Sequence, residues 1–245
     1  MRPVRRGVSP QRSDFSNYVD AKPELVSRLG SYCSYCERRV NTNLAVEHIQ
    51  PKGLAASKAL IGTWSNFLLA CVNCNATKKD KPVVLANLFL PDRDNTSAAF
   101  VYSEDGKIAL SSTLTLPVDQ DRASDLLALV GLDKKISELT DANDKQIALD
   151  RVSQRMEVWG IASMFKDQIV REPNNNALRD CVVQLALAHG FFSVWMTVFL
   201  GDIDMRKRFI EAFPGTAESG CFDPTTTNLV FPAPNRDHLR DGSKL

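Results

Sequence analysis

The sequence lacks a long hydrophobic run. No uninterrupted apolar stretch reaches the roughly 18 residues that a membrane-spanning helix needs. The first twelve residues, MRPVRRGVSPQR, also lack the apolar segment that follows the charged region of a secretory signal peptide. We therefore expect a cytoplasmic protein without a membrane partner.

An excess of charge of either sign is also missing. The 30 basic and 29 acidic residues give a formal net charge of +1, so no general attraction to nucleic acid is predicted and any such contact must rest on local clusters. The two basic clusters are Arg2, Arg5, Arg6 and Arg12 in the N-terminal arm, and Lys78, Lys79 and Lys81. Each cluster is compatible with an ordinary solvated surface, but the position of the second beside a cysteine pair favours a functional role for it.

Cysteine is scarce but unevenly distributed. Four of the six cysteines form two C-x-x-C pairs, Cys33 with Cys36 and Cys71 with Cys74. In a chain of this size such pairs favour a metal site in a reducing compartment over a disulfide framework. Four thiolates complete the tetrahedral coordination of zinc and leave no open position, so we predict a structural Zn²⁺.

The residue pattern predicts an α+β protein in four parts. Residues 1–30 form a basic arm and a helix from Tyr18 to Leu29, and residues 31–91 hold both cysteine pairs. Residues 92–120 contain a β-hairpin that turns at Asp105–Gly106. Residues 121–245 form a mainly helical half.

Two long helical stretches are expected in that half, at about 141–170 and about 175–213, with a break near Gly201. Their apolar residues are predicted to pack in the core and not to bind a cofactor. The residues concerned are Ile147, Val152, Met156, Trp159 and Phe165 in the first stretch, and Phe191, Phe192, Trp195 and Phe199 in the second.

Between the cysteine pairs lies a polar motif that simple zinc binding does not require. The segment LAVEHIQP has the alternation of a strand and carries Glu47 and His48 side by side. Adjacent strand residues point to opposite faces, so both can serve one site only at a strand end or a bulge. The segment from Trp64 to Lys79 is predicted to contain a helix, with Trp64, Phe67, Leu68 and Leu69 packed inward.

In order, these motifs are C-x-x-C, then E-H-I-x-P-K, then W-x-N-x-L-x-x-C-x-x-C-N-x-x-K. This arrangement resembles the HNH endonuclease family over about fifty residues. The resemblance implies a ββα-metal core that is stabilised by the zinc knuckle. It also implies His48 as general base, Glu47 and Asn75 as ligands of a catalytic cation, and Asn66 as a brace of the loop.

The chemistry of phosphodiester hydrolysis calls for the same residue types. A neutral imidazole suits a base at neutral pH, and His48 is the only histidine near the motif. Oxygen ligands such as those of Glu47 and Asn75 suit Mg²⁺ or Mn²⁺. Many family members have aspartate at the Glu47 position, and the additional methylene moves the carboxylate by about 1.5 Å.

DNA is the expected substrate, with Lys52, Lys78 and Lys79 as contacts to its phosphates, although Lys78 could instead simply end a helix. More specifically, MRPVRRG-x-S-P, YCSYCERR, LAVEHIQPK and WSNFLLACVNCN resemble the HNH subunits of bacterial anti-phage systems, above all the PtuB nucleases of Septu. That resemblance implies an ABC-type ATPase partner, PtuA-like, docked on the helical half.

Two alternatives stay open. One is a catalytically silent zinc-knuckle module that binds nucleic acid or a protein partner, which would not require His48 beside Glu47 and Asn75. The other is a stand-alone restriction-type HNH enzyme. The near-neutral charge and the lack of a second DNA-reading motif weigh mildly against the latter.

Overall fold

The computed structural model describes all 245 residues. The N-terminal half contains η1 (Tyr18–Ala21), α1 (Lys22–Leu29), β1 (Ala45–His48), η2 (Ala55–Leu60), η3 (Trp64–Asn66), β2 (Phe67–Ala70), α2 (Val72–Lys78), η4 (Leu85–Asn87), α3 (Thr96–Ala99), β3 (Phe100–Tyr102) and β4 (Ile108–Leu110). The C-terminal half contains α4 (Pro117–Val130), η5 (Ile136–Glu138), α5 (Ala142–Arg171), α6 (Asn176–His189), α7 (Phe192–Val198), α8 (Ile203–Ala212) and α9 (Thr216–Ser219).

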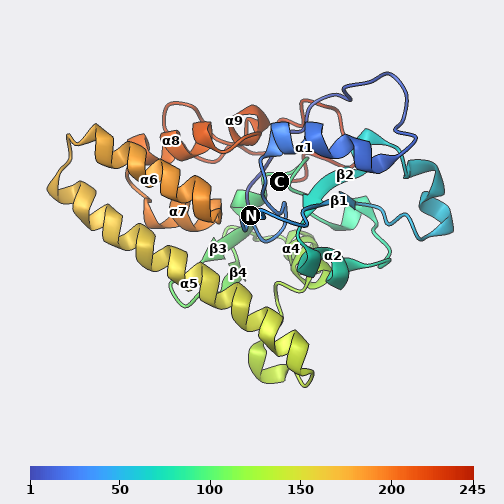
Figure 1. Ribbon diagram of the computed structural model, residues 1–245, viewed down its shortest axis with the longest axis horizontal. Helices are drawn as coiled ribbons and strands as arrows, with labels where there is room; N and C mark the ends of the chain where they lie inside the picture. Colours follow the sequence, from blue (N-terminus) through green and yellow to red (C-terminus); the bar gives the residue numbers. More distant parts are fainter.

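Helices and two small sheets form the mixed architecture that the sequence predicts. β1, β2 and α2 lie at one side of the molecule, helices α6 to α8 lie at the other, and the β3–β4 pair lies between them (Figure 1). The long α5 runs along these parts and extends beyond them at its N-terminal end (Figure 1). No helix combines the length and the apolar character needed to cross a membrane.

β1 and β2 pair antiparallel, so that Glu47 lies opposite Leu68 and His48 opposite Phe67. Every residue of β2 is buried, because the sheet lies inside the core. Cys71 has an extended backbone, and α2 begins at the next residue. The helix expected between Trp64 and Lys79 is therefore confined to the last part of that segment, and its apolar first part is a 3-10 turn and a strand.

The hairpin predicted at Asp105–Gly106 is confirmed by the antiparallel pairing of β3 with β4. Gly106 has a left-handed backbone, with φ of +72°, and a Cβ added there would lie 2.5 Å from the carbonyl oxygen of Val152 on α5. Glycine meets both demands, because it tolerates positive φ and leaves room for the close approach. The turn therefore allows the hairpin to pack closely against α5.

The C-terminal helices follow the predicted pattern, with one additional break. Asp141 caps α5 by accepting a hydrogen bond from the Asp144 amide. The break near Gly201 is present, between α7 and α8. A second break, at Gly190 and Phe191, was not predicted, and Phe191 has a left-handed backbone with φ of +56°.

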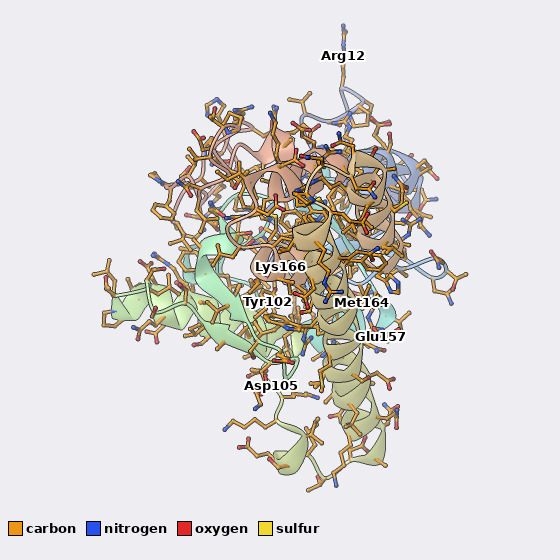
Figure 2. All side chains as sticks on the ribbon, turned by 90° about the vertical axis from the view of Figure 1, so that its left-hand side faces the viewer. Arg12, Tyr102, Asp105, Glu157, Met164 and Lys166 are labelled. Carbon is orange, nitrogen blue, oxygen red and sulfur yellow. The ribbon has the colours of Figure 1, made fainter.

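The aromatic residues predicted for the core of this half are buried, namely Phe191, Phe192, Trp195 and Phe199. The prediction for α5 was correct only in part. Trp159 and Phe165 are partly buried and pack against the core, whereas Met156 is exposed and Ile147 and Val152 are only partly buried. Two arginines, Arg151 and Arg155, share the buried face with Ala148, Val158 and Ala162. Figure 2 views α5 from the side that carries the exposed Glu157 and Met164.

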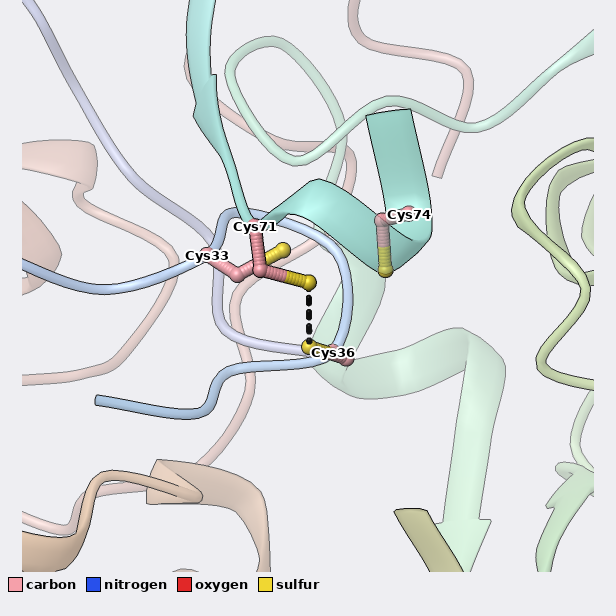
Figure 3. Close-up of side chains that lie close together, drawn as sticks. All are labelled: Cys33, Cys36, Cys71 and Cys74. Atoms are coloured by element: carbon pink, nitrogen blue, oxygen red, sulfur yellow. Dashed lines mark hydrogen bonds between the residues drawn. The ribbon is translucent and has the colours of Figure 1, made fainter. Parts of the chain in front are cut away.

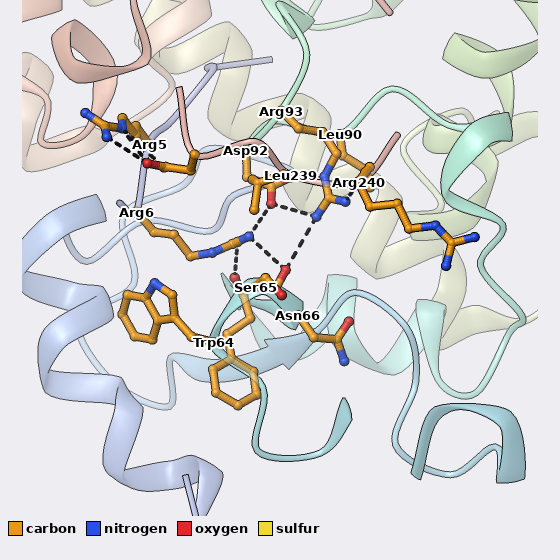
Figure 4. A network of polar contacts seen from close by, with 12 residues as sticks. Arg5, Arg6, Trp64, Ser65, Asn66, Leu90, Asp92, Arg93, Leu239 and Arg240 are labelled. Atoms are coloured by element: carbon orange, nitrogen blue, oxygen red, sulfur yellow. Dashed lines mark hydrogen bonds and ion pairs between the residues drawn. The ribbon is translucent and has the colours of Figure 1, made fainter. Parts of the chain in front are cut away.

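The N-terminal arm differs from both interpretations of its arginines, a contact with nucleic acid and a solvated surface. Arg2 is buried and donates hydrogen bonds to the carbonyl oxygens of Leu29 and Pro214. Arg6 is buried and donates to the carbonyl oxygens of Phe67 and Ser65 while pairing with Asp92 (Figure 4). Of the four arginines, only Arg12 projects freely from the arm (Figure 2).

Candidate active site

The four cysteines of the two C-x-x-C pairs come together in the core. Their sulfur atoms all lie within 4.8 Å of one another, and all four residues are buried (Figure 3). Tetrahedral Zn–S bonds of about 2.3 Å place neighbouring sulfurs about 3.8 Å apart, and the Sγ atoms of Cys36 and Cys71 are 3.7 Å apart. The geometry fits a metal ion and, with four thiol ligands, suggests zinc.

Two arginines lie near this cysteine cluster, Arg38 from the same segment of the chain and Arg151 from a distant one. Arg151 of α5 donates a hydrogen bond to Cys74 Sγ at 3.3 Å and another to the carbonyl oxygen of Gly131. Burial lowers the pKa of the Arg38 guanidinium, but the nearby thiolates of the cluster outweigh it and raise that pKa overall. Because a zinc ion bound by four thiolates carries a net charge of −2, these cations are placed to neutralise it.

His48 lies at the end of β1, where the strand pattern stops. Its Nε2 atom lies 3.0 Å from the carbonyl oxygen of Ile61. A carbonyl oxygen only accepts hydrogen bonds, so Nε2 carries the proton and the lone pair of the neutral ring is on Nδ1. Burial lowers the pKa of His48, and the nearby charges of Lys52 and Lys78 lower it further against the opposing effect of the Ile61 hydrogen bond. The imidazole is therefore neutral at pH 7.

Glu47 is only 2% exposed. Its Oε1 atom lies 2.9 Å from the ammonium nitrogen of Lys78 and accepts a hydrogen bond from the Tyr35 hydroxyl at 3.4 Å. Burial raises the pKa of Glu47, although the Lys78 charge opposes this effect. No protein group donates to Oε2, which leaves that oxygen available to a ligand.

Asn66 closes the segment that runs from Gln50 to η3. Its side-chain oxygen accepts a hydrogen bond from the Gln50 amide at 2.8 Å. Its side-chain nitrogen donates to the carbonyl oxygens of Gln50 at 3.0 Å and Leu60 at 3.3 Å. The three bonds hold both ends of the loop that presents the Ile61 carbonyl to His48.

Glu47, His48 and Asn75 line one open cleft of about 480 Å³. The strand end is what permits this arrangement, since adjacent residues inside a regular strand would face opposite sides. The side-chain amide of Asn75, on α2, makes no hydrogen bond within the protein and is only partly buried. Glu47 and Asn75 thus both line the cleft, and each has a side-chain oxygen without a hydrogen-bond partner in the protein. Oxygen ligands of this type are those that hard divalent cations bind.

The three lysines proposed to contact phosphate differ in exposure. Lys52 and Lys79 are exposed and line the cleft. The Lys52 ammonium donates a hydrogen bond to the Tyr18 hydroxyl at 2.6 Å. Lys78 is only 1% exposed and is engaged by Glu47 and by the carbonyl oxygen of His48, at 2.7 Å. Its position is internal, unlike the surface position expected for a phosphate contact.

Several residues that line the cleft were not predicted from the sequence. Tyr18 packs its ring edge-on against His48, with centroids 4.7 Å apart, and Lys22 lines the same cleft from the start of α1. No spacing in the sequence connects these residues with the motif some 30 residues later. The burial of Lys78 could have been foreseen, because it stands four residues after Cys74 on the same face of α2.

Comparison with known proteins agrees with the geometry of this region. Residues 33–81 match the model of the HNH endonuclease family. The match covers 49 of the 245 residues and spans both cysteine pairs, β1, β2 and α2. No curated protein matches the chain as a relative. The family match supports an HNH-type nuclease domain, and such a domain implies a nucleic-acid substrate.

Proposed function

We propose that this protein is a metal-dependent HNH endonuclease that hydrolyses phosphodiester bonds of DNA. The observation that carries the proposal is the convergence of His48, Glu47 and Asn75 on one cleft beside the four-cysteine site. A silent zinc module has no need of that constellation. β1, β2 and α2 would then be the ββα-metal core of the family.

His48 is proposed as the general base. The Ile61 carbonyl fixes the proton on Nε2, so Nδ1 is free to take a proton from a water molecule. The hydroxide equivalent attacks phosphorus, the bond to the 3′ oxygen breaks, and that oxygen leaves after gaining a proton from solvent. The products are a 5′-phosphate and a 3′-hydroxyl. The depressed pKa of His48 keeps the ring in its neutral, proton-accepting form at pH 7.

Glu47 and Asn75 are proposed to hold Mg²⁺ or Mn²⁺ through Glu47 Oε2 and the Asn75 side-chain oxygen. When bound, such an ion stabilises the negative charge that develops on the phosphate and the leaving oxygen. Lys52 and Lys79 are proposed to bind phosphates of the substrate strand from the rim of the cleft. Asn66 is proposed to act indirectly, by holding the loop that orients His48.

The four cysteines are proposed to bind a structural Zn²⁺. Four protein ligands leave no coordination position for water or substrate, so this ion would hold the ends of the insertion together and take no part in the reaction. The two metal sites would have different roles. Zinc would stabilise the fold around the cleft, and the second ion would take part in phosphodiester hydrolysis.

The biological setting is proposed from sequence likeness alone. The motifs resemble those of Septu-type anti-phage nucleases, so we propose an effector nuclease that works with an ABC-type ATPase docked on the helical half. Co-expression with such an ATPase encoded beside it should give a stable complex. If the protein cleaves DNA fully without a partner, the stand-alone restriction-type enzyme becomes the better description.

Cleavage of supercoiled plasmid tests the enzymatic proposal. Wild-type protein with Mn²⁺ or Mg²⁺ should convert the plasmid to nicked or linear forms, and His48→Ala should abolish this at unchanged zinc content. His189→Ala is the matched control, because His189 ends α6 outside the cleft. Equal cleavage by His48→Ala and wild type would rule out the proposed mechanism.

A further inference from the structure

Lys78 is a buried charged residue of the cleft lining that has no role in the proposed reaction. It is the last residue of α2, only 1% exposed, and its ammonium contacts two acceptors on β1. These are Glu47 Oε1 at 2.9 Å and the carbonyl oxygen of His48 at 2.7 Å. Burying an ammonium group is costly unless it is paired, and the pairing here is with the carboxylate proposed to bind the divalent cation.

The Lys78 contact determines how much charge the site offers to a cation. Glu47 contributes one negative charge, which Lys78 balances, and the amide of Asn75 is neutral. The cysteine cluster is the only place where three or more carboxylate, thiol or imidazole ligands converge. The other charged residues that line the cleft are Asp80 and three lysines, Lys22, Lys52 and Lys79. A divalent cation in the cleft would therefore meet no net negative charge from the protein.

We propose that Lys78 is the resident counter-ion of Glu47 and makes divalent-cation binding depend on the phosphate of the substrate. This inference rests on the proposed function of the same cleft. A phosphodiester brings the missing negative charge together with oxygen ligands, so the cation and the nucleic acid bind cooperatively. Lys78 also fixes Oε1, so that Oε2 alone is presented to the cation.

Lys78 has two opposing effects on the affinity of the site for a divalent cation. It orients Glu47, which favours binding, and it repels the cation, which disfavours binding. Without Lys78 the Glu47 side chain gains rotational freedom, which disfavours cation binding modestly. Removal also ends the repulsion between a charge of +1 and a charge of +2 bound to the same carboxylate. Without its counter-ion the buried Glu47 carboxyl also has a higher pKa, so the affinities are compared at a pH high enough to keep it ionised. Under that condition, in a largely buried site, the repulsion is the greater effect. Free protein that lacks Lys78 should therefore bind the cation more tightly.

Mn²⁺ binding measured by electron paramagnetic resonance tests the proposal without reference to catalysis. The probe is Mn²⁺ alone or with a short DNA duplex carrying phosphorothioate linkages, at equal zinc content. For the wild type we expect the duplex to tighten Mn²⁺ binding by about tenfold or more. Lys78→Met, whose side chain fills similar space, should bind Mn²⁺ about tenfold more tightly than wild type without DNA. Lys78→Arg keeps the charge and should resemble the wild type.

Two results would overturn the proposal. One is a folded Lys78→Met protein whose affinity for Mn²⁺ equals or falls below that of the wild type. The other needs no variant and is tight Mn²⁺ binding by the free wild type that the duplex does not improve. If instead the wild type neither binds Mn²⁺ with the duplex nor cleaves DNA, the proposed cation site itself is wrong, a different outcome from the failure of Lys78 alone.

Discussion

Replacing Asn66 with alanine should destabilise the protein by about 3 kcal/mol. The buried amide makes three hydrogen bonds, to the Gln50 amide, the Gln50 carbonyl and the Leu60 carbonyl. Each contributes about 0.5 to 1.5 kcal/mol, and alanine leaves all three backbone groups without this partner, which gives a loss of about 1.5 to 4.5 kcal/mol.

Urea denaturation at a fixed excess of Zn²⁺ measures this loss as a difference in the free energy of unfolding. Asn87→Ala is the matched control, because Asn87 is exposed and its side chain makes no hydrogen bond, so its effect should stay within about 0.5 kcal/mol. DNA cleavage should also fall in Asn66→Ala, since the same loop presents the Ile61 carbonyl to His48. A loss below about 1 kcal/mol would refute the account of Asn66 as a brace.

Two further predictions concern the charged groups of the core. Burial alone would raise the pKa of Asp92, but Arg93 and Arg6 lower it to about 2 (Figure 4). Its stabilising effect should thus be complete above about pH 4 and be lost only as pH falls toward 2. The stability difference between wild type and Asp92→Asn, about 3 to 5 kcal/mol, should stay constant from pH 7 to 4 in urea denaturation. A narrowing within that range would contradict the assignment. Arg151→Met should weaken zinc binding by about tenfold in competition with a chelating dye, whereas Arg171→Met at the exposed end of α5 should not, and equal affinities would show that Arg151 does not support the metal.

From the sequence, the cysteine spacing predicted the cluster of four thiols, and the Glu47–His48 pair predicted a strand end at which both residues line one cleft. Both features are local, because a C-x-x-C pair and a strand end constrain their own neighbourhood. The burial of Arg2 and Arg6 could not be predicted in this way. Their partners are backbone carbonyls of Leu29, Pro214, Ser65 and Phe67, which only the complete fold brings to the arm.

The buried face of α5 was mispredicted for a related reason. Helical periodicity assigns apolar residues to the core and charged residues to solvent, yet Arg151 is buried on this helix because it reaches Gly131 and Cys74. Arg155 is also buried, and the adjacent Met156 is exposed instead. A long charged side chain can therefore occupy the core wherever the rest of the chain supplies hydrogen-bond acceptors. The hydrophobic pattern of a helix contains no information about such acceptors.

The most direct test of the central claim is cleavage of DNA in water enriched in ¹⁸O, followed by mass spectrometry of the products. If His48 activates water against phosphorus, each cut should place one ¹⁸O atom in the new 5′-phosphate. His48→Ala should yield no labelled product at equal zinc content. Cleavage that leaves the 5′ end unlabelled, or labelling that persists in His48→Ala, would contradict the account of this cleft as a hydrolytic nuclease site.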